Sequence, residues 1–238
     1  MTRAWLVLPT YNEAENIGPL VRAALAALQT AGVTHRVLIV DDGSPDGTGR
    51  IADGLAAELE PVEVLHRERK QGLGRAYLAG FARALEGGAE LVMEMDSDFS
   101  HDPADIPRLI AAADAADLVL GSRYVVGGGI SNWGLVRRLV SRGGSAYARW
   151  LLGVPVRDLT GGFKCFNRRV LETIDLDGVH ADGYGFQIEL TYRAIKAGFT
   201  VTEVPIVFRE REVGSSKMTA RIALEAVWKV PALRLRGR

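Results

Sequence analysis

The sequence predicts an α/β fold in which helices cover both faces of a mostly parallel central sheet. Short apolar runs such as "RVLIV" at 36–40 recur through the first half of the chain, and segments with the apolar spacing of an amphipathic helix separate them. Most of the runs do not alternate apolar with polar residues, as strands with one solvated face do. Strands that are apolar on both sides need cover on both faces, and the helices between them supply it.

The elements of the first half follow one another in a regular order. The predicted strands are the apolar runs at residues 4–8, 36–40, 62–66, 90–95 and 117–121. The predicted helices that alternate with them have Gly, Pro or polar residues at their ends and occupy residues 15–32, 48–60, 72–88 and 103–116.

The second half is less regular. An amphipathic helix is predicted at residues 134–153, with an interruption near Gly143 and Gly144. The elements predicted after it are a helix at 183–199, a strand at 201–208 and a basic amphipathic helix or tail at 218–238.

The composition narrows the classes of function. Lys plus Arg equals Asp plus Glu at 29 each, so no overall positive field favours nucleic acid as a partner. The single cysteine, Cys165, excludes an internal disulfide and a multi-cysteine zinc site, and we expect it to be a small buried side chain. No window reaches the roughly 18 apolar residues that a membrane-crossing helix needs. We therefore expect a cytoplasmic protein, peripheral on the cytoplasmic face of a membrane.

The loops that follow the predicted strands are the places to search for a site, because ligands of such sheets bind outside the carboxyl ends of the strands. The first loop, "PTYNEAEN" at 9–16, combines a helix-capping asparagine with Tyr11, whose ring could stack on a base. The second, "VDDGSPDGTG" at 40–49, forms a tight turn, and its two adjacent carboxylates could also accept hydrogen bonds from a base or a ribose. Neither a dinucleotide-binding glycine motif nor a P-loop is present.

The third loop, "MDSDFSHDP" at 95–103, carries the strongest chemical signal. Asp96 and Asp98 lie at i and i+2, so in a regular strand both carboxylates share a face and could reach one cation. Such an acidic pair is also typical of ordinary turns, but its position after a buried strand favours Mg²⁺ or Mn²⁺. His101 is the only histidine in these loops, and a turn or supporting role is favoured for it. In the fourth loop, Arg123 follows a strand and could meet a phosphate bidentately.

Six segments together carry a family resemblance: "LPTYNEAENI", "VDDGSPDGT", "MDSDFSHDP", "GSRYV", "DLTGGFKCFNRRVL" and "GYGFQIEL". They resemble the inverting family 2 glycosyltransferases with the GT-A fold, a Rossmann-like nucleotide-sugar-binding fold. More narrowly, they are similar to the dolichyl- and polyprenyl-phosphate mannose synthases. The resemblance covers about residues 4–217. It implies one domain over 1–217, with a nucleotide-sugar-binding half at 1–125 and an acceptor-binding half at 126–217.

The resemblance implies transfer of mannose from GDP-mannose to the phosphate of a polyprenyl or dolichyl lipid, with inversion and with Mg²⁺ or Mn²⁺ as cofactor. The product is a polyprenyl-phosphate β-mannose, which serves as a lipid-linked sugar donor. The implied nucleotide-sugar-binding residues are Pro9, Tyr11, Glu13, Val40, Asp41, Asp42, Asp96, Ser97, Asp98, Arg123, Arg211 and Lys217. The implied catalytic residues are Asp98, Arg123 and Glu189, of which Glu189 either orients Arg123 or the acceptor or simply stabilises its helix.

The metal ligands implied by the family pattern are Asp96 and Asp98, and Ser100 stands where some relatives have a glutamine ligand. Because serine is shorter, we expect water between Ser100 and the ion. Arg211 and Lys217 belong to a segment, 209–218, that we expect to close over the diphosphate. Asp158 either touches the sugar or makes a turn.

The acceptor phosphate is expected at Arg138, Arg142 and Ser145, in the basic amphipathic helix at 134–153. That helix fits two interpretations: a core-packing helix with a solvated basic face, or a helix that lies on an anionic membrane surface. We favour the interfacial one, here and for the C-terminal segment, and a membrane-anchoring protein partner is compatible with it.

Three other functions compete with mannose transfer. The donor could be UDP-glucose, with the same mechanism. The chain could be a non-catalytic lipid-phosphate-binding subunit of a membrane glycosylation complex, although such a subunit does not need an assembled charge site. A metal-dependent phosphohydrolase would release phosphate or GDP without a lipid acceptor.

Overall fold

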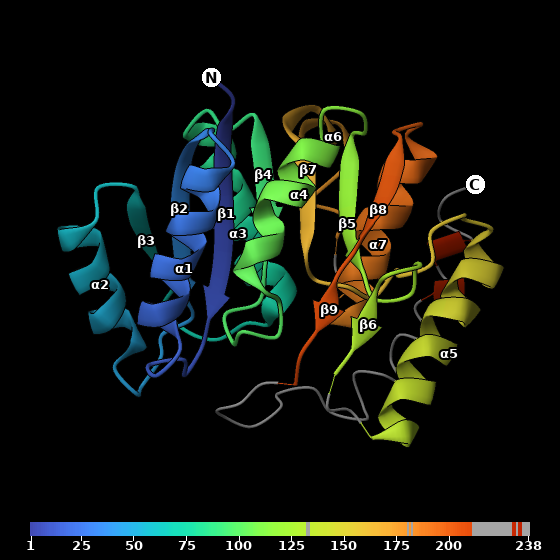
Figure 1. Cartoon of the computed structure of the whole chain (residues 1–238), viewed down its shortest axis with the longest axis horizontal. Helices are drawn as coiled ribbons and strands as arrows, with labels where there is room; N and C mark the ends of the chain where they lie inside the picture. The colour runs from blue at the N-terminus through green and yellow to red at the C-terminus, as the bar shows by residue number, and fades with distance from the viewer. Residues whose placement is uncertain (132–133, 180, 182, 211–229, 232, 235–238) are drawn as a thin grey trace.

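The computed structural model describes residues 1–131, 134–179, 181, 183–210, 230–231 and 233–234 (Figure 1). Its main sheet has seven strands in the order β3-β2-β1-β4-β7-β5-β8, and a second sheet pairs β6 with β9. The strands are β1 (Arg3–Thr10), β2 (Thr34–Asp41), β3 (Val62–His66), β4 (Leu91–Glu94), β5 (Leu118–Ser122), β6 (Gly129–Ile130), β7 (Lys164–Asn167), β8 (Val201–Pro205) and β9 (Val207–Phe208). The α/β class and the mostly parallel sheet are confirmed.

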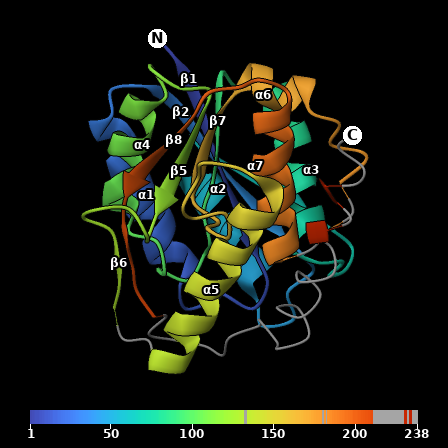
Figure 2. The ribbon, with the colours of Figure 1, turned by 90° about the vertical axis from the view of Figure 1, so that its right-hand side faces the viewer.

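Helices cover both faces of the main sheet, as the apolar strands require (Figures 1 and 2). The helices are α1 (Ile17–Thr30), α2 (Thr48–Glu58), α3 (Leu73–Glu86), the 3₁₀ turn η1 (Pro103–Asp105), α4 (Ile106–Ala112), α5 (Leu135–Leu152), α6 (Arg168–Thr173) and α7 (Tyr184–Lys196). Side chains of α1, α2 and α4 pack in one core, and those of α3, α5 and α7 pack in the other.

Strand β7 was not predicted, and it is the one antiparallel strand of the main sheet, between β4 and β5. Its sequence, "KCFN", is short and begins with a lysine, so it lacks the apolar run by which the other strands were found. Lys164 is nevertheless fully buried, because its ammonium group lies 3.2 Å from the equally buried carboxylate of Glu94.

Two predicted boundaries were wrong. The predicted strand 201–208 is two strands, because β8 pairs with β5 as far as Pro205 and β9 then leaves the main sheet to pair with β6. Helix α5 runs without interruption through Gly143 and Gly144. Glycine weakens a helix by about 1 kcal/mol per residue but does not end it, and burial of Ala148 and Leu152 on the same helix offsets that cost.

Most of the predicted C-terminal segment 218–238 lies outside the described residues. Within it, Val230 is buried in the core shared by α3, α5 and α7, and Arg234 donates a hydrogen bond of 2.6 Å to the carbonyl of Leu151 in α5. In the part of the chain that the structure describes, no helix combines the length and the apolar character needed to cross a bilayer.

Candidate functional site

The four loops that follow the predicted strands meet at one edge of the sheet. β1 runs parallel to β2 and β4, and β7 is antiparallel to both β4 and β5, so β1, β2, β4 and β5 all point the same way. Their carboxyl ends lie at the lower edge of the sheet in Figure 1. The loops containing Tyr11, Asp42, Asp98 and Arg123 therefore border a common region, as predicted.

The loop after β1 is tied to the loop after β2. Thr10 donates to the carbonyl of Val40 at 3.2 Å, and the amide of Glu13 donates to Thr48 Oγ1 at 2.9 Å. Pro9 is buried in the strand end, and the half-buried ring of Tyr11 carries the ammonium group of Lys70 4.2 Å from its centroid. The expected nucleoside-binding positions thus lie together, with an aromatic face and a cation beside them.

The adjacent carboxylates at the end of β2 have different partners. Asp41 accepts a 2.5 Å hydrogen bond from the Ser44 hydroxyl, which makes the tight turn. Asp42 forms an ion pair with Arg67. Burial raises the pKa of Asp42, although the Arg67 guanidinium opposes that shift.

Arg67 and Lys70 were not predicted, because in the loop after residues 62–66 only the glycine-rich stretch at 70–80 gave a signal, a weak one for a phosphate site. That strand is β3, which is parallel to β2, so its loop opens at the same edge. The basic run "HRERK" at 66–70 was the available signal.

The two aspartates lie in the loop that follows β4 and have separate hydrogen-bond partners. The Tyr77 hydroxyl donates to Asp96 Oδ1 at 3.4 Å, and the amide of Ser100 donates to Asp98 Oδ1 at 3.0 Å. The Ser97 hydroxyl donates to the carbonyl of Pro9 at 2.9 Å, so Ser97 fastens this loop to β1.

His101 is buried beside both aspartates. Its ring packs against Phe163 and Phe208, and its Nδ1 lies 3.7 Å from Asp96 Oδ2. Burial lowers the pKa of His101 to about 4, although Asp98 opposes that shift. The imidazole is therefore neutral at pH 7 and adds no positive charge next to the carboxylates.

These groups fit a divalent metal with oxygen ligands. Among the described residues, no three His, Cys, Asp or Glu side chains converge on one point, so an all-protein cage is not formed there. Two carboxylates, with other positions left to substrate oxygens and water, are the usual arrangement for Mg²⁺. Asp96 and Asp98 supply that pair, and Ser100 is buried next to them.

Arg123 lies at the end of β5 in a buried ion pair with Asp158. Its Nε and Nη2 each donate a 2.7 Å hydrogen bond to the Asp158 carboxylate, and its backbone amide donates another at 3.0 Å. Burial opposes both charges, but their attraction is stronger, so the pKa of Asp158 is lowered and that of Arg123 is raised. A bidentate contact with phosphate through this edge of Arg123 would require the pair to open. The turn interpretation of Asp158 did not anticipate this partner.

Glu189 is buried in α7 and is held by Arg193 of the same helix. Nε and Nη2 of Arg193 donate to Glu189 Oε1 at 3.0 and 2.7 Å, and Arg193 also bonds the carbonyls of Asp175 and Gly178. These contacts support the structural interpretation of Glu189 and show no bond to Arg123. Its contact with an acceptor stays a prediction.

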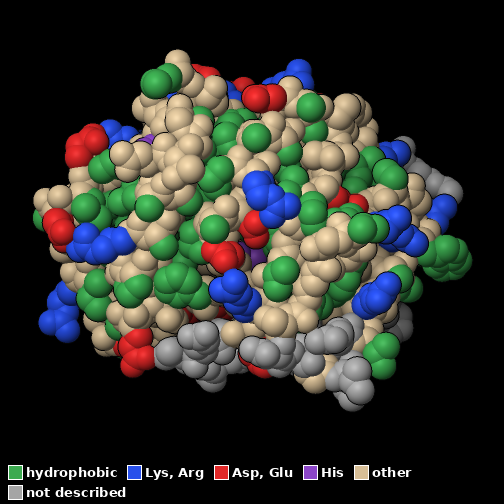
Figure 3. Space-filling model, in the orientation of Figure 1, with side chains coloured by type: hydrophobic (Ala, Val, Ile, Leu, Met, Phe, Trp, Pro, Cys, Tyr) green, Lys and Arg blue, Asp and Glu red, His purple; other side chains and the backbone are tan. Residues whose placement is uncertain are grey.

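The expected acceptor helix, α5, is joined to the site by Ser145, whose hydroxyl lies 3.1 Å from that of Thr160. Arg142 is exposed on the same helix. The side chain of Arg138 is outside the described part of α5, and Arg211 and Lys217 are outside the described residues. On the surface, basic and hydrophobic side chains alternate at the right-hand side, where α5 lies (Figure 3).

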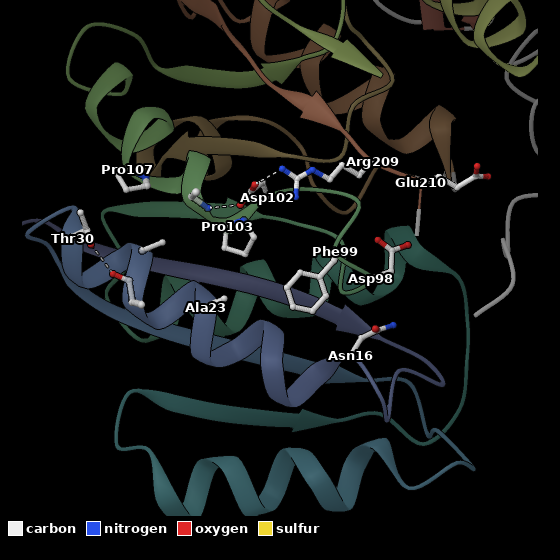
Figure 4. Close-up of a pocket in the computed structure, with 13 residues that line it drawn as sticks. Asn16, Ala23, Thr30, Asp98, Phe99, Asp102, Pro103, Pro107, Arg209 and Glu210 are labelled. Carbon is white, nitrogen blue, oxygen red and sulfur yellow. Dashed lines mark hydrogen bonds and ion pairs between the residues drawn. The ribbon is translucent and has the colours of Figure 1, made fainter. Parts of the chain in front are cut away.

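A groove of about 800 Å³ opens beside Asp98 and runs between α1 and the η1 turn (Figure 4). Its walls are mostly small or apolar, including Ala23, Phe99 and Pro103. An ion pair of 3.2 Å between Arg209 and Asp102 crosses its rim. The groove lacks Tyr11 and Asp42, so it adjoins the region of the expected nucleotide site without being that site.

Comparison with known proteins gives a family match. The model of glycosyl transferase family 2 matches residues 5–175. A polyprenol monophosphomannose synthase from Mycolicibacterium smegmatis is 50% identical over 238 residues, which cover 99% of this chain and 88% of that protein. An undecaprenyl-phosphate mannosyltransferase from Micrococcus luteus is 48% identical over 228 residues, covering 96% of this chain and 92% of that protein.

Solved structures share the fold. Glucosyl-3-phosphoglycerate synthase from Mycobacterium tuberculosis, in complex with Mn²⁺, UDP and phosphoglyceric acid, superposes with a TM-score of 0.73 over 98% of this chain and 78% of that one. Its complex with Mg²⁺ and UDP gives 0.72 over 98% and 79%. At 21% identity in both cases, the likeness bears on the fold alone.

Proposed function

The chain belongs to glycosyl transferase family 2, and we propose that it transfers mannose from GDP-mannose to the phosphate of a polyprenyl lipid, with inversion, in a metal-dependent reaction. The main support for the proposal is the similarity, over nearly the whole chain, to two relatives that are both named for mannose transfer to a polyprenyl phosphate or for its product. We assign nucleotide-sugar binding to residues 1–125 and acceptor binding to 126–217.

The leaving group of this reaction is a nucleoside diphosphate, on which negative charge grows as the glycosidic bond breaks. Asp96 and Asp98 would hold Mg²⁺ or Mn²⁺, which supplies a Lewis acid for those oxygens. Arg123, with Arg211 and Lys217, would add fixed positive charge that stabilises the transition state more than the ground state.

The acceptor explains why the site needs no strong base. A phosphate monoester is already ionised at pH 7, so it requires positioning rather than deprotonation. A neutral His101 and a Glu189 bonded to Arg193 are compatible with that requirement. Arg138, Arg142 and Ser145 are the residues that we assign to the acceptor phosphate.

A lipid acceptor places the reaction at a membrane surface. Leu139 and Trp150 of α5 are 69% and 77% exposed, and Arg142 and Arg149 are exposed beside them. We propose that α5 lies on the cytoplasmic face of a membrane, where a membrane-anchoring protein could also hold the enzyme.

The test is a transfer assay with purified protein, a polyprenyl phosphate in vesicles and labelled GDP-mannose, with and without Mg²⁺ or Mn²⁺. We expect metal-dependent label in the lipid fraction, and a loss of at least about 100-fold in Asp98→Ala, as for removal of one transition-state stabilising group. Label from UDP-glucose alone would overturn the donor. Release of free GDP or phosphate without lipid product would indicate a phosphohydrolase, and no reaction in folded protein would favour a non-catalytic subunit.

A further inference from the structure

The acceptor helix α5 is connected to Arg123 by a continuous set of hydrogen bonds. Arg123 Nη2 donates to Thr160 Oγ1 at 2.7 Å, and that same oxygen lies 3.1 Å from Ser145 Oγ of α5. Arg123 is 5% exposed and Ser145 is 1% exposed, while Thr160, which joins them, is half-buried.

A hydrogen-bond count shows that Thr160 is the junction of this network. A threonine hydroxyl has one proton to donate and two lone pairs that accept. Thr160 Oγ1 accepts from Arg123, lies 3.3 Å from Asp158 Oδ1 as a donor, and keeps one lone pair for Ser145. All of its hydrogen-bonding capacity is then used by one cation, one carboxylate and one hydroxyl of α5.

A second contact joins the same helix to the neighbour of Arg123. Tyr124 donates to Ser141 Oγ at 2.7 Å, and its ring lies 5.2 Å from the Arg123 guanidinium carbon. Ser141 and Ser145 are four residues apart, so they share one face of α5. That face is directed at the Arg123 site.

The other side of the network is rigid. Glu203 of β8 accepts hydrogen bonds from the backbone amides of Arg157 at 2.8 Å and Asp158 at 2.9 Å. Asp158, fixed in this way and fully buried, bonds two nitrogens of Arg123. Thr160 is therefore the hydrogen-bonded contact through which a displacement of α5 would reach the guanidinium, next to the ring contact of Tyr124.

We propose that Thr160 is a positioning residue that holds Arg123 for the diphosphate and couples acceptor binding at α5 to nucleotide binding at the sheet edge. This inference rests on the proposed function, in which Arg123 contacts the diphosphate and α5 receives the lipid phosphate. Binding of the acceptor at α5 changes the position of Ser145, which changes the geometry of Thr160 and Arg123. Coupling of two sites by such a shared element is reciprocal.

The first experiment measures the ratio of GDP to GMP affinity, by calorimetry with Mn²⁺, in the wild type and in Thr160→Val. This ratio isolates the β-phosphate, where Arg123 acts, and general destabilisation does not change it. UDP and UMP are measured in parallel, and the pair that binds more tightly is used. We expect the ratio to fall about 5-fold or more in Thr160→Val, in line with the loss of one hydrogen bond to a charged group, and to recover in Thr160→Ser.

The control is Thr191→Val. Thr191 is fully buried, whereas Thr160 is half-buried, and among the described residues the Thr191 hydroxyl bonds only the carbonyl of Gln187 in its own helix, at 3.0 Å. An unchanged ratio in a folded Thr160→Val protein, or an equal fall in Thr191→Val, would overturn the positioning role. If Thr160→Val does not fold, Thr160→Ala and Thr160→Ser are compared in the same way.

The second experiment measures GDP affinity with and without saturating farnesyl phosphate. In the wild type we expect a change of about 5-fold or more, the usual size of such coupling. In Thr160→Val, at a farnesyl phosphate concentration shown to saturate that variant, it should fall towards one, because the Thr160 hydroxyl that contacts both Arg123 and Ser145 is removed. An equal effect of farnesyl phosphate in both proteins, or none in the wild type, would overturn the coupling.

These outcomes separate the inference from the proposed function. If the wild type transfers no sugar to lipid but the GDP to GMP ratio still falls in Thr160→Val, the transfer reaction is refuted and the role of Thr160 stands. Protein that binds neither GDP nor UDP would refute both.

Discussion

Burial, rather than residue type, decides what single side chains of this protein can do. Cys165 is fully buried in β7, and burial raises the pKa of its thiol to about 12. Since the thiolate is the reactive species, only about one molecule in 10,000 carries it at pH 8. Burial likewise keeps His101 neutral. Asp158 is also buried, but it stays charged because Arg123 is bonded to it.

Cys165 should therefore resist thiol reagents in the folded protein. With a chromogenic disulfide reagent at pH 8, we expect reaction at least about 100-fold slower than in guanidinium-unfolded protein. The unfolded protein is the control, and it should release one equivalent because the chain has one cysteine. Rapid reaction without denaturant would contradict the buried position of β7.

Asp158→Asn should destabilise the protein strongly, because it leaves the buried Arg123 charge without its partner. The expected loss in the free energy of unfolding is about 3–5 kcal/mol at pH 7. The exposed pair of Arg22 and Glu58 provides the control, because Glu58→Gln should have a much smaller effect. Urea unfolding followed by circular dichroism measures both.

The pH dependence of that loss has a defined sign. The pKa of Asp158 is lowered in the folded state, so its stabilising contribution is complete above the unfolded-state pKa of about 3.9 and is lost as the pH falls toward the folded value. The difference between wild type and Asp158→Asn should be constant from about pH 7 to 5 and shrink below about pH 4. A difference that already shrinks between pH 7 and 6 would contradict the assignment.

At the scale of elements, helix α3 approaches the sheet more closely than any residue larger than glycine permits. A Cβ on Gly80 would lie 2.3 Å from Val7 Cγ1 and 3.2 Å from Val40 Cγ2. Valine side chains have little freedom to move aside, so the helix itself would have to shift.

Gly80→Ala should consequently lower the free energy of unfolding by about 1–3 kcal/mol, despite the better helix propensity of alanine. Gly54→Ala in α2 is the matched control, since no atom lies within 4 Å of its Cβ position. That control should be neutral or stabilising by up to about 1 kcal/mol. Chemical denaturation of both variants tests the difference, and equal effects at the two positions would mean that α3 is not packed this closely.

The sequence predicts some of these helices and strands but not others. Apolar runs and helical spacing located β1 to β5 and α1 to α4, because those elements bury their own local pattern. Strand β7 was not found because its first residue, Lys164, is stabilised by Glu94, which is far away in sequence. The partner of Arg123 is 35 residues away, at Asp158, so no local pattern could identify it. The loops after parallel strands could be assigned to one edge of the sheet from the sequence. The hydrogen-bond partners of their side chains could not be predicted.

In the whole molecule, helix α5 has one face directed at the site and the opposite face directed outward. At 3.6 residues per turn, Trp150 lies three turns after Leu139 on the same side, with Arg142 and Arg149 beside them. Ser145 and Ala148 lie on the opposite side and are 1% and 0% exposed. A helix with one apolar and basic face outward is suited to an anionic bilayer.

Trp150→Ala should therefore weaken binding to vesicles of phosphatidylglycerol and phosphatidylcholine by about 10-fold or more, because insertion of a large apolar side chain contributes about 1.5–3 kcal/mol. Changing Arg142 and Arg149 together to glutamine should weaken it further at low salt and have less effect at high salt, since screening removes the electrostatic part. Vesicle sedimentation measures both.

The control is Ile51→Ala, because Ile51 is an exposed apolar residue of α2, on a different helix. If Ile51→Ala weakens binding as much as Trp150→Ala, the membrane contact is not specific to α5, and the lipid phosphate would have to enter the site from another face.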